Sequence, residues 1–146
     1  MDWVNPEEDK SQILFHSQEI DFALSDQEKY QSWILQILAK EKKACGLINY
    51  IFCNDNYLLE KNQSYLHHDT LTDIITFEYS TEPISGDIFI SIDRIKENAS
   101  ERNLSTEVEL QRVMAHGILH LCGYGDKKEE EKMLMRRKEE ESMQLF

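Results

Sequence analysis

The sequence lacks the features of membrane and secreted proteins. No apolar run among its 146 residues approaches the roughly 20 residues that span a bilayer. The first ten residues, MDWVNPEEDK, have neither the basic nor the apolar stretch of a secretory signal, so we expect a cytoplasmic protein without a membrane partner. The three cysteines are an odd number and form no Cys-x-x-Cys pair, which fits a reducing compartment.

Positive charge is also scarce. The chain has 16 Lys and Arg against 28 Asp and Glu, a net charge of −12, whereas proteins that bind phosphates strongly carry a basic footprint. Much of the acidic excess lies in short runs at residues 7–9, 129–131 and 139–141, which we interpret as solvated faces. We expect local positive potential from a bound metal ion and from four basic residues: Arg94, Lys96, Arg102 and Arg112.

What remains is the composition of one ordinary domain. Hydrophobic residues make up 40% and charged residues 30% of the chain, as in a globular protein of this size. No internal repeat or low-complexity linker interrupts it. We therefore expect one domain over residues 1–146.

The hydrophobic pattern alternates between strand and helix periods. It predicts strands at 13–15, 47–53, 73–79 and 87–92, the last two adjacent and joined by a loop that contains Pro83 and Gly86. It predicts helices from a capping box at residues 25–28 to about Lys42, briefly after Asn54, at 93–103 and at 106–122. A charged tail helix at 127–146 has a weak apolar side of Met133, Leu134 and Met143. The predicted fold is α+β, with a mixed sheet of about four strands and helices packed on it.

The helix at 106–122 is predicted to be anchored in the core. A second capping box, residues 106–109, begins it and would use Glu109 as a capping residue. His116 and His120 lie together on the flank of one stripe that its core-facing residues share: Leu110, Val113, Met114, Gly117 and Leu121. Glycine costs about 1 kcal/mol in a helix, so Gly117 implies a close approach to the sheet.

The end of that helix reads HGILHLCGYGD, or H-x-x-x-H-x-x-G-x-x-D. Histidines four residues apart lie on one helix face, so His116 and His120 can bind one ion. Gly123 can stop the helix in a left-handed conformation, and the turn then brings Asp126 back as a third ligand. Three protein ligands leave a zinc ion one open position for a water molecule, as in catalytic sites. Two histidines alone are often an ordinary surface pair, but the added glycine and carboxylate favour one zinc ion per chain.

The same spacing occurs in metzincin proteases, with one important difference. Position 117 is Gly where a zinc protease needs the Glu that acts as its general base. Peptide hydrolysis by this route would therefore lack its base.

The residues around the ligands resemble a specific family. HGILHLCGYGD is similar to the signature H-G-x-L-H-L-x-G-Y-D-H of the YbeY family. Residues 62–65 with 72–77 resemble its N-x-x-Y-R…T-D-V-L-S-F segment, and residues 86–91 resemble its G-D-I-x-I strand. The resemblance implies a zinc-dependent, single-strand-specific endoribonuclease. It would act through His116, His120 and Asp126 in 16S ribosomal RNA 3′-end maturation and ribosome quality control. The resemblance also implies ribosomal RNA as its partner, together with the small ribosomal subunit.

The chain departs from the family pattern at two positions. Asp126 replaces the third histidine, and a carboxylate shifts the metal preference somewhat toward manganese or iron. Leu66 replaces an arginine that the resemblance implies holds phosphate. His67 or His68 would supply positive charge nearby, although such histidines are usually plain surface.

Two other functions stay open from the sequence. One is a metallo-hydrolase acting on peptides or small molecules, which the missing Glu at position 117 disfavours. The other is a non-catalytic ribosome assembly factor with a structural metal, which the missing Arg at position 66 keeps open.

Overall fold

The computed structural model describes residues 12–66 and 71–146. Residues 7–9, His67 and His68 of the sequence analysis lie outside these ranges. The described elements follow in the order β1 (Ile13–Gln18), α2 (Gln27–Lys40), β2 (Cys45–Cys53), α3 (Asp55–Leu66), β3 (Ile74–Thr81), β4 (Ile84–Ser91), α4 (Ile92–Glu101), α5 (Thr106–Leu121) and α6 (Glu129–Gln144).

The four strands form one mixed sheet in the order β1-β2-β4-β3. β2 runs parallel to both β1 and β4, while β3 pairs with β4 as an antiparallel hairpin. The fold is therefore a single α+β domain, as predicted, and the two strands expected to be neighbours are neighbours. β3 lies at an edge of the sheet, beside the helix that carries the histidines.

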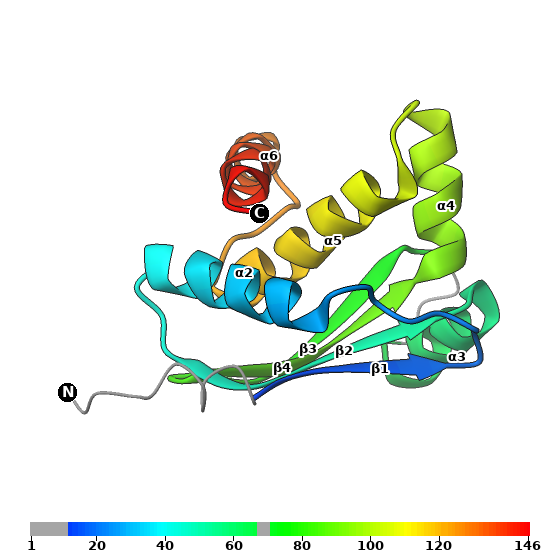
Figure 1. Ribbon diagram of the computed structural model, residues 1–146, viewed down its shortest axis with the longest axis horizontal. Helices are drawn as coiled ribbons and strands as arrows, with labels where there is room; N and C mark the ends of the chain where they lie inside the picture. The colour runs from blue at the N-terminus through cyan, green and yellow to red at the C-terminus, as the bar shows by residue number, and fades with distance from the viewer. Residues whose placement is uncertain (1–11, 67–70) are drawn as a thin grey trace.

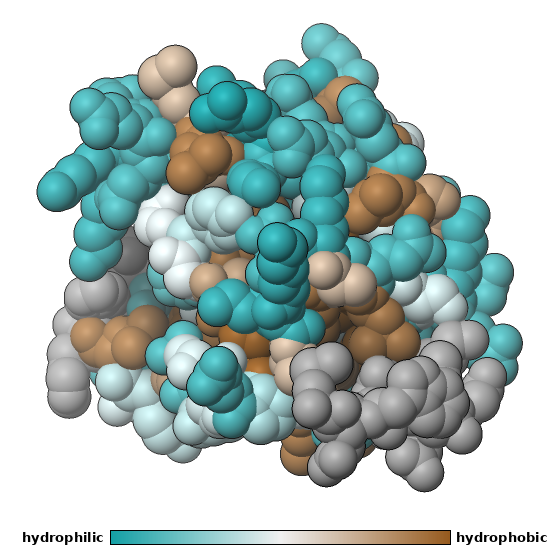
Figure 2. Space-filling model, turned by 90° about the vertical axis from the view of Figure 1, so that its left-hand side faces the viewer, coloured by the Kyte–Doolittle hydropathy of each residue, from teal (hydrophilic) through white to brown (hydrophobic). Residues whose placement is uncertain are grey.

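The helices lie in layers. Figure 1 shows α2 and α5 across one face of the sheet, α6 as an outer layer above them, and α3 against the opposite face at one end. No helix in the described ranges is long and apolar enough to cross a bilayer. Figure 2, which views the end at the left of Figure 1, shows mostly hydrophilic side chains with hydrophobic ones in separate patches.

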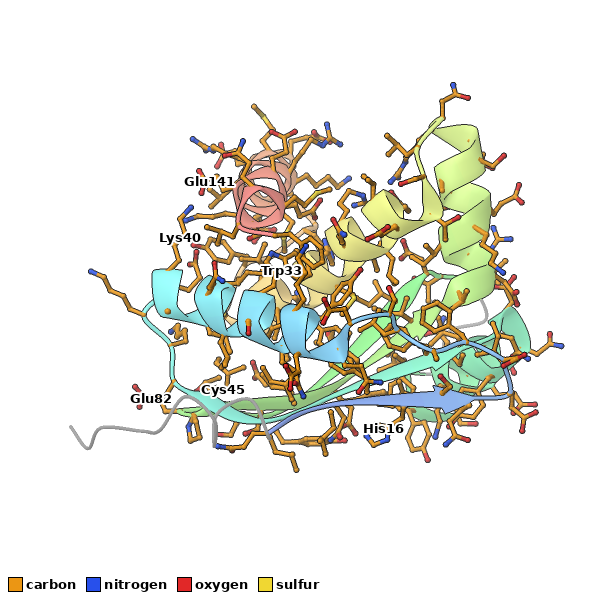
Figure 3. The ribbon with its side chains drawn as sticks, in the orientation of Figure 1. His16, Trp33, Lys40, Cys45, Glu82 and Glu141 are labelled. Carbon is orange, nitrogen blue, oxygen red and sulfur yellow. The ribbon has the colours of Figure 1, made fainter. Side chains whose placement is uncertain are left out.

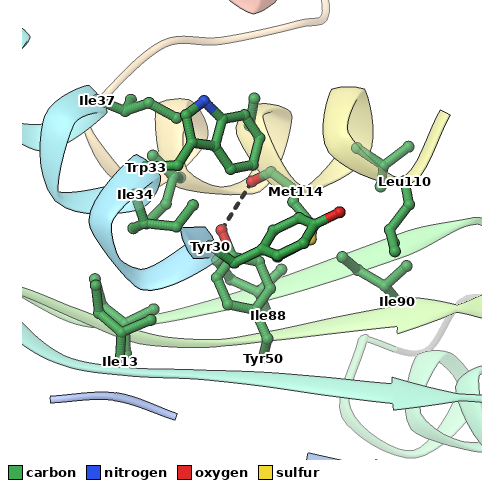
Figure 4. Close-up of a cluster of buried hydrophobic side chains, with 14 of the residues drawn as sticks. Ile13, Tyr30, Trp33, Ile34, Ile37, Tyr50, Ile88, Ile90, Leu110 and Met114 are labelled. Atoms are coloured by element: carbon green, nitrogen blue, oxygen red, sulfur yellow. Dashed lines mark hydrogen bonds between the residues drawn. The ribbon is translucent and has the colours of Figure 1, made fainter. Parts of the chain in front are cut away.

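The main core lies between the sheet and the layer of α2 and α5 (Figure 4). Two large aromatic residues in it keep their polar groups bonded, as buried Tyr and Trp require. The Tyr50 hydroxyl donates to the Met114 carbonyl over 2.9 Å, and Trp33 Nε1 donates to the Ser142 carbonyl over 2.7 Å. These bonds tie α5 to the sheet and α6 to α2.

A second, smaller cluster lies on the opposite face of the sheet, under α3: Ile51, Cys53, Leu58, Ile75 and Phe89. Beyond it, side chains form a hydrogen-bonded row across all four strands. His16 and Asn49 are 2.8 Å apart, Asn49 donates to Asp87, and the Tyr79 hydroxyl donates to the other oxygen of Asp87. Figure 3 shows His16 on the side of the sheet opposite Trp33.

The predicted loop between the last two strands is shorter than expected. β4 begins at Ile84 rather than at residue 87, so Gly86 lies inside the strand. A Cβ atom at Gly86 would lie 2.5 Å from the Phe77 carbonyl oxygen. The glycine therefore marks a close approach between strands and not a loop.

Both predicted capping boxes were off by one residue. Asp26, at φ 55°, caps α2 through a bond from the Lys29 amide, and the helix ends at Lys40. Ser105 caps α5 by accepting from the Val108 amide, which leaves Glu109 without a capping role. The tail helix also turns a different side inward, because Met135, Glu139 and Ser142 are buried while Met133 is exposed.

Candidate metal centre

α5 carries both predicted histidine ligands and is fixed closely to the sheet. Its predicted apolar stripe is buried. A Cβ atom at Gly117 would lie 2.9 Å from Ile88 Cγ2 and 3.0 Å from Ile74 Cδ1, so the expected close approach to the sheet is confirmed. His116 is partly buried and His120 is exposed, on the flank where the sequence places them.

The turn after α5 returns toward His116. Gly123 has φ 110°, a conformation that favours glycine, and its amide bonds the His120 carbonyl. The chain then brings Asp126 Oδ2 to 3.2 Å from His116 Nε2. Cys122 packs against the core, and burial, with the Glu41 charge, raises the pKa of its thiol to about 11. A protonated thiol there is a packing group, not a ligand.

Each histidine ring is held at Nδ1. His116 Nδ1 lies 2.7 Å from Glu139 Oε2, and His120 Nδ1 lies 3.1 Å from the Tyr124 carbonyl oxygen. Acceptors at Nδ1 are the usual partners of metal-binding histidines, because they orient the ring and leave Nε2 for the ion. The orientation of both rings therefore suits metal binding through Nε2.

The turn itself is tied to two helices. The Tyr124 hydroxyl donates to Glu41, which follows α2, and Lys138 of α6 bonds the other oxygen of Glu41 over 3.3 Å. Figure 3 shows a second contact between these helices, where Lys40 reaches toward Glu141. The turn that leads to Asp126 is thus anchored through Tyr124 to Glu41.

The surroundings of His116 are acidic. Burial alone would lower its pKa, but the hydrogen bond and charge of Glu139, with the charges of Asp126 and Asp73, outweigh burial and raise the pKa. A site that favours a proton on this ring also favours a metal cation, since both are positive charges at the same nitrogen.

The structure brings together two of the three predicted ligands. His116 and Asp126 are in contact, but among residues 12–66 and 71–146 no three His, Cys, Asp or Glu side chains are grouped closely enough to hold an ion. His120 is not part of this contact, so its place as the third ligand stays a prediction. Two imidazoles and one carboxylate are a donor set that zinc accepts.

Glu139 is the feature that sequence reasoning missed. It was interpreted as part of a solvated acidic run, yet it is buried between Arg112 and His116. Its signal was its spacing, because Met135, Glu139 and Ser142 follow one another at i, i+4 and i+7 on one helix face.

The expected source of positive potential is also largely absent. Arg112 bonds Glu109 and Glu139, and Arg102 bonds Glu109, which is fully buried and therefore needs these partners. Arg94 pairs with Asp55, while Lys96 is exposed. Three of the four cations are thus already paired with carboxylates.

Leu66, at the position of the family arginine, ends α3 and is 39% exposed. In the middle of the same helix, Lys61 Nζ lies 4.9 Å from the ring centre of Tyr65 and 5.5 Å from that of Tyr57. The helix α3 therefore carries two tyrosine rings, one near each end, with one lysine beside them.

Comparisons with known proteins agree with this fold and motif. A sequence model of the family described as Endoribonuclease YbeY matches residues 12–146. The Endoribonuclease YbeY of Flavobacterium psychrophilum is 54% identical over 92% of this chain and 96% of its own length. That of Flavobacterium johnsoniae is 50% identical over 88% and 93%. A solution structure of a Thermotoga maritima protein, at 27% identity, superposes with a TM-score of 0.67 over 91% of this chain and 87% of its own.

The fold and site define an α+β protein in which a His-x-x-x-His helix ends beside a carboxylate. The chain belongs to the Endoribonuclease YbeY family. It is thus an endoribonuclease, an enzyme that cleaves internal phosphodiester bonds of RNA.

Proposed function

We propose that this chain is a zinc-dependent, single-strand-specific endoribonuclease of ribosomal RNA maturation, acting at the 3′ end of 16S RNA and in ribosome quality control. One zinc ion per chain would be held by His116, His120 and Asp126. Ribosomal RNA, with the small ribosomal subunit, would be the partner in the cytoplasm, and residues 1–146 would act as one unit. The family of the relatives supports the reaction class.

The observation that carries the metal site is the pair of contacts on His116. Its Nδ1 is bonded to a buried carboxylate, and its Nε2 faces Asp126 at 3.2 Å. This arrangement places an imidazole nitrogen and a carboxylate oxygen at one point on the surface, at the end of an anchored helix.

The residues around the proposed metal centre have different roles. A zinc ion there would lower the pKa of a water molecule and polarise a phosphoryl oxygen. The Tyr124 carbonyl holds the His120 ring, and the Glu41 contact holds the turn that carries Asp126. Gly117 supplies no carboxylate base, which separates the site from that of zinc proteases.

Weak RNA binding follows from the charge. Arg94, Arg102 and Arg112 are paired to carboxylates, so three of the four cations expected near the metal contribute little to displacing counterions from RNA. We expect low affinity that decreases as salt rises.

The test is cleavage of single-stranded ribosomal RNA fragments by zinc-loaded protein, with and without a chelator. Cleavage should stop with the chelator and in His116→Ala, whereas His16→Ala, which removes a histidine on the opposite sheet face, should keep it. RNA binding without chelator-sensitive cleavage would favour a non-catalytic assembly factor. Peptide cleavage that is lost in His116→Ala would favour a metallo-hydrolase of peptides.

The position of Leu66 gives a second experiment. If phosphate is held at the end of α3, Leu66→Arg should raise the single-turnover rate of RNA cleavage, because an arginine adds charge-assisted bonds to phosphate. Leu47→Arg, at an exposed residue of β2, adds the same charge elsewhere and is the matched control. An equal rise in both variants would mean that only net charge matters.

A further inference from the structure

Glu139 occupies an unusual position for an acidic residue of a highly acidic chain. It lies on α6, outside the segments in which the sequence analysis finds a resemblance to the family, and its side chain is 6% exposed. Its two oxygens have different partners: Oε1 accepts from Arg112 over 3.2 Å, and Oε2 lies 2.7 Å from His116 Nδ1. The carboxylate therefore joins the C-terminal helix to the candidate metal centre.

Pairing with Arg112 accounts for only one of the two Glu139 oxygens. Arg112, which shares the buried carboxylate of Glu109 with Arg102, makes two hydrogen bonds to Glu109, from Nε and Nη2. Its third bond, to Glu139 Oε1, fixes the rotation of the Glu139 carboxylate. The other oxygen is thereby aimed at the imidazole.

The two carboxylates beside His116 compete for its proton when the ring is neutral. Glu139 is closer, at 2.7 Å, and is buried, whereas Asp126 lies 3.2 Å from Nε2 and is 43% exposed. A carboxylate can only accept, so a proton on Nε2 would turn the Nδ1 lone pair toward the buried oxygen of Glu139. That arrangement would leave a buried charge without its bond, which is costly.

We propose that Glu139 is a positioning residue for metal binding: it holds the proton of His116 on Nδ1 and so leaves Nε2, the atom facing Asp126, as the ligand. This inference rests on the metal centre proposed above. It assigns to the C-terminal helix a part in metal affinity, in addition to its part in packing.

The first test determines the tautomer of His116 directly. Nitrogen-15 NMR of His116 in metal-free protein, at a pH above the titration of the ring, distinguishes the two neutral tautomers. We expect the Nδ1–H form in the wild type and a shift toward the Nε2–H form in Glu139→Gln. A wild type with the proton on Nε2 would overturn the proposal. A merely structural role for Glu139 would leave the tautomer unchanged.

The second test is zinc affinity, measured by competition with a chromogenic chelator. Glu139→Gln should weaken binding about 10- to 100-fold, the usual effect of removing such a partner. Glu140→Gln is the matched control, because it removes the same charge from an exposed residue of the same helix and should bind zinc like the wild type. Circular dichroism and thermal midpoints confirm that each variant is folded.

The outcomes separate the two proposals. Equal zinc affinity in the wild type and folded Glu139→Gln, with an unchanged tautomer, overturns the role of Glu139 alone. A wild type that binds no zinc overturns the metal centre as well. Equal weakening in Glu139→Gln and Glu140→Gln would mean that charge in general, and not this hydrogen bond, sets the affinity, and would also contradict the proposal.

Discussion

The two ends of α5 use polar side chains in opposite ways. Near its N-terminus, Glu109 is fully buried, and both its oxygens are bonded by Arg112 and Arg102. Near its C-terminus, His116 and His120 are each held at Nδ1 by protein, which leaves Nε2 as the nitrogen that we propose binds metal. The first end is closed and stabilises the fold, while the second is held in place yet open. The comparison separates the residues of α5 that stabilise the fold from those that we propose form the metal centre.

The largest expected effect on the free energy of unfolding comes from removing a partner of the buried Glu109, near the N-terminus of α5. Arg112→Met leaves two buried carboxylates, Glu109 and Glu139, short of partners and should lower the free energy of unfolding by about 3–5 kcal/mol. Arg102→Met removes the 50% exposed partner of the same carboxylate and should cost about 1 kcal/mol or less. Urea denaturation measures both. Equal losses would show that the cluster does not depend on burial.

The next largest effect on stability is expected at the N-cap of α5. Ser105 accepts a bond from the Val108 amide, so Ser105→Ala should cost about 1 kcal/mol. Thr106→Ala is the control, because Thr106 is the first helical residue and should contribute much less. The same urea measurement applies, and a larger loss in Thr106→Ala would restore the cap that the sequence predicted.

At the open end, the turn can be loosened without touching a ligand. Tyr124→Phe removes the hydroxyl that donates to Glu41 and should cost about 0.5–1.5 kcal/mol in unfolding free energy, while also weakening zinc binding. Tyr79→Phe removes an exposed hydroxyl bonded to Asp87 on the opposite sheet face and should change neither quantity appreciably. Unchanged zinc affinity in Tyr124→Phe would mean that the turn is rigid without this bond.

The smallest expected effect is a pH dependence of the metal-free protein. The pKa of His116 is raised in the folded state above its ordinary value of 6.5. Its contribution to stability is therefore fully present below about pH 6.5 and is lost as pH rises through the folded-state pKa. Urea midpoints between pH 6 and 9, relative to those of His116→Gln, measure it. A wild-type curve parallel to that of the variant would contradict the assignment.

The sequence predicted the parts of this molecule that follow from local pattern. The period of α5, the close approach at Gly117 and the helix stop at Gly123 each depend on a few neighbouring residues, and each was correct. The adjacency of β3 and β4 also follows from a short connection. The His116–Asp126 contact is local in the same sense, since one turn joins them.

What the sequence did not reveal depends on partners far along the chain. Glu109 looks like a capping residue until Arg102 and Arg112 are seen on it, and Glu139 looks solvated until α6 docks beside His116. The type of a charged residue does not by itself show whether the residue is buried or exposed. Pairing across 23 residues, as between His116 and Glu139, is set by packing and not by pattern.

The central claim is that His116, His120 and Asp126 hold one metal ion at the end of α5. Anomalous diffraction at the zinc edge, from crystals of zinc-loaded protein, tests it most directly. We predict one peak per chain, about 2.0–2.2 Å from Nε2 of each histidine and from an oxygen of Asp126. A peak that His120 does not contact, or no peak at this turn in zinc-loaded protein, would contradict the account.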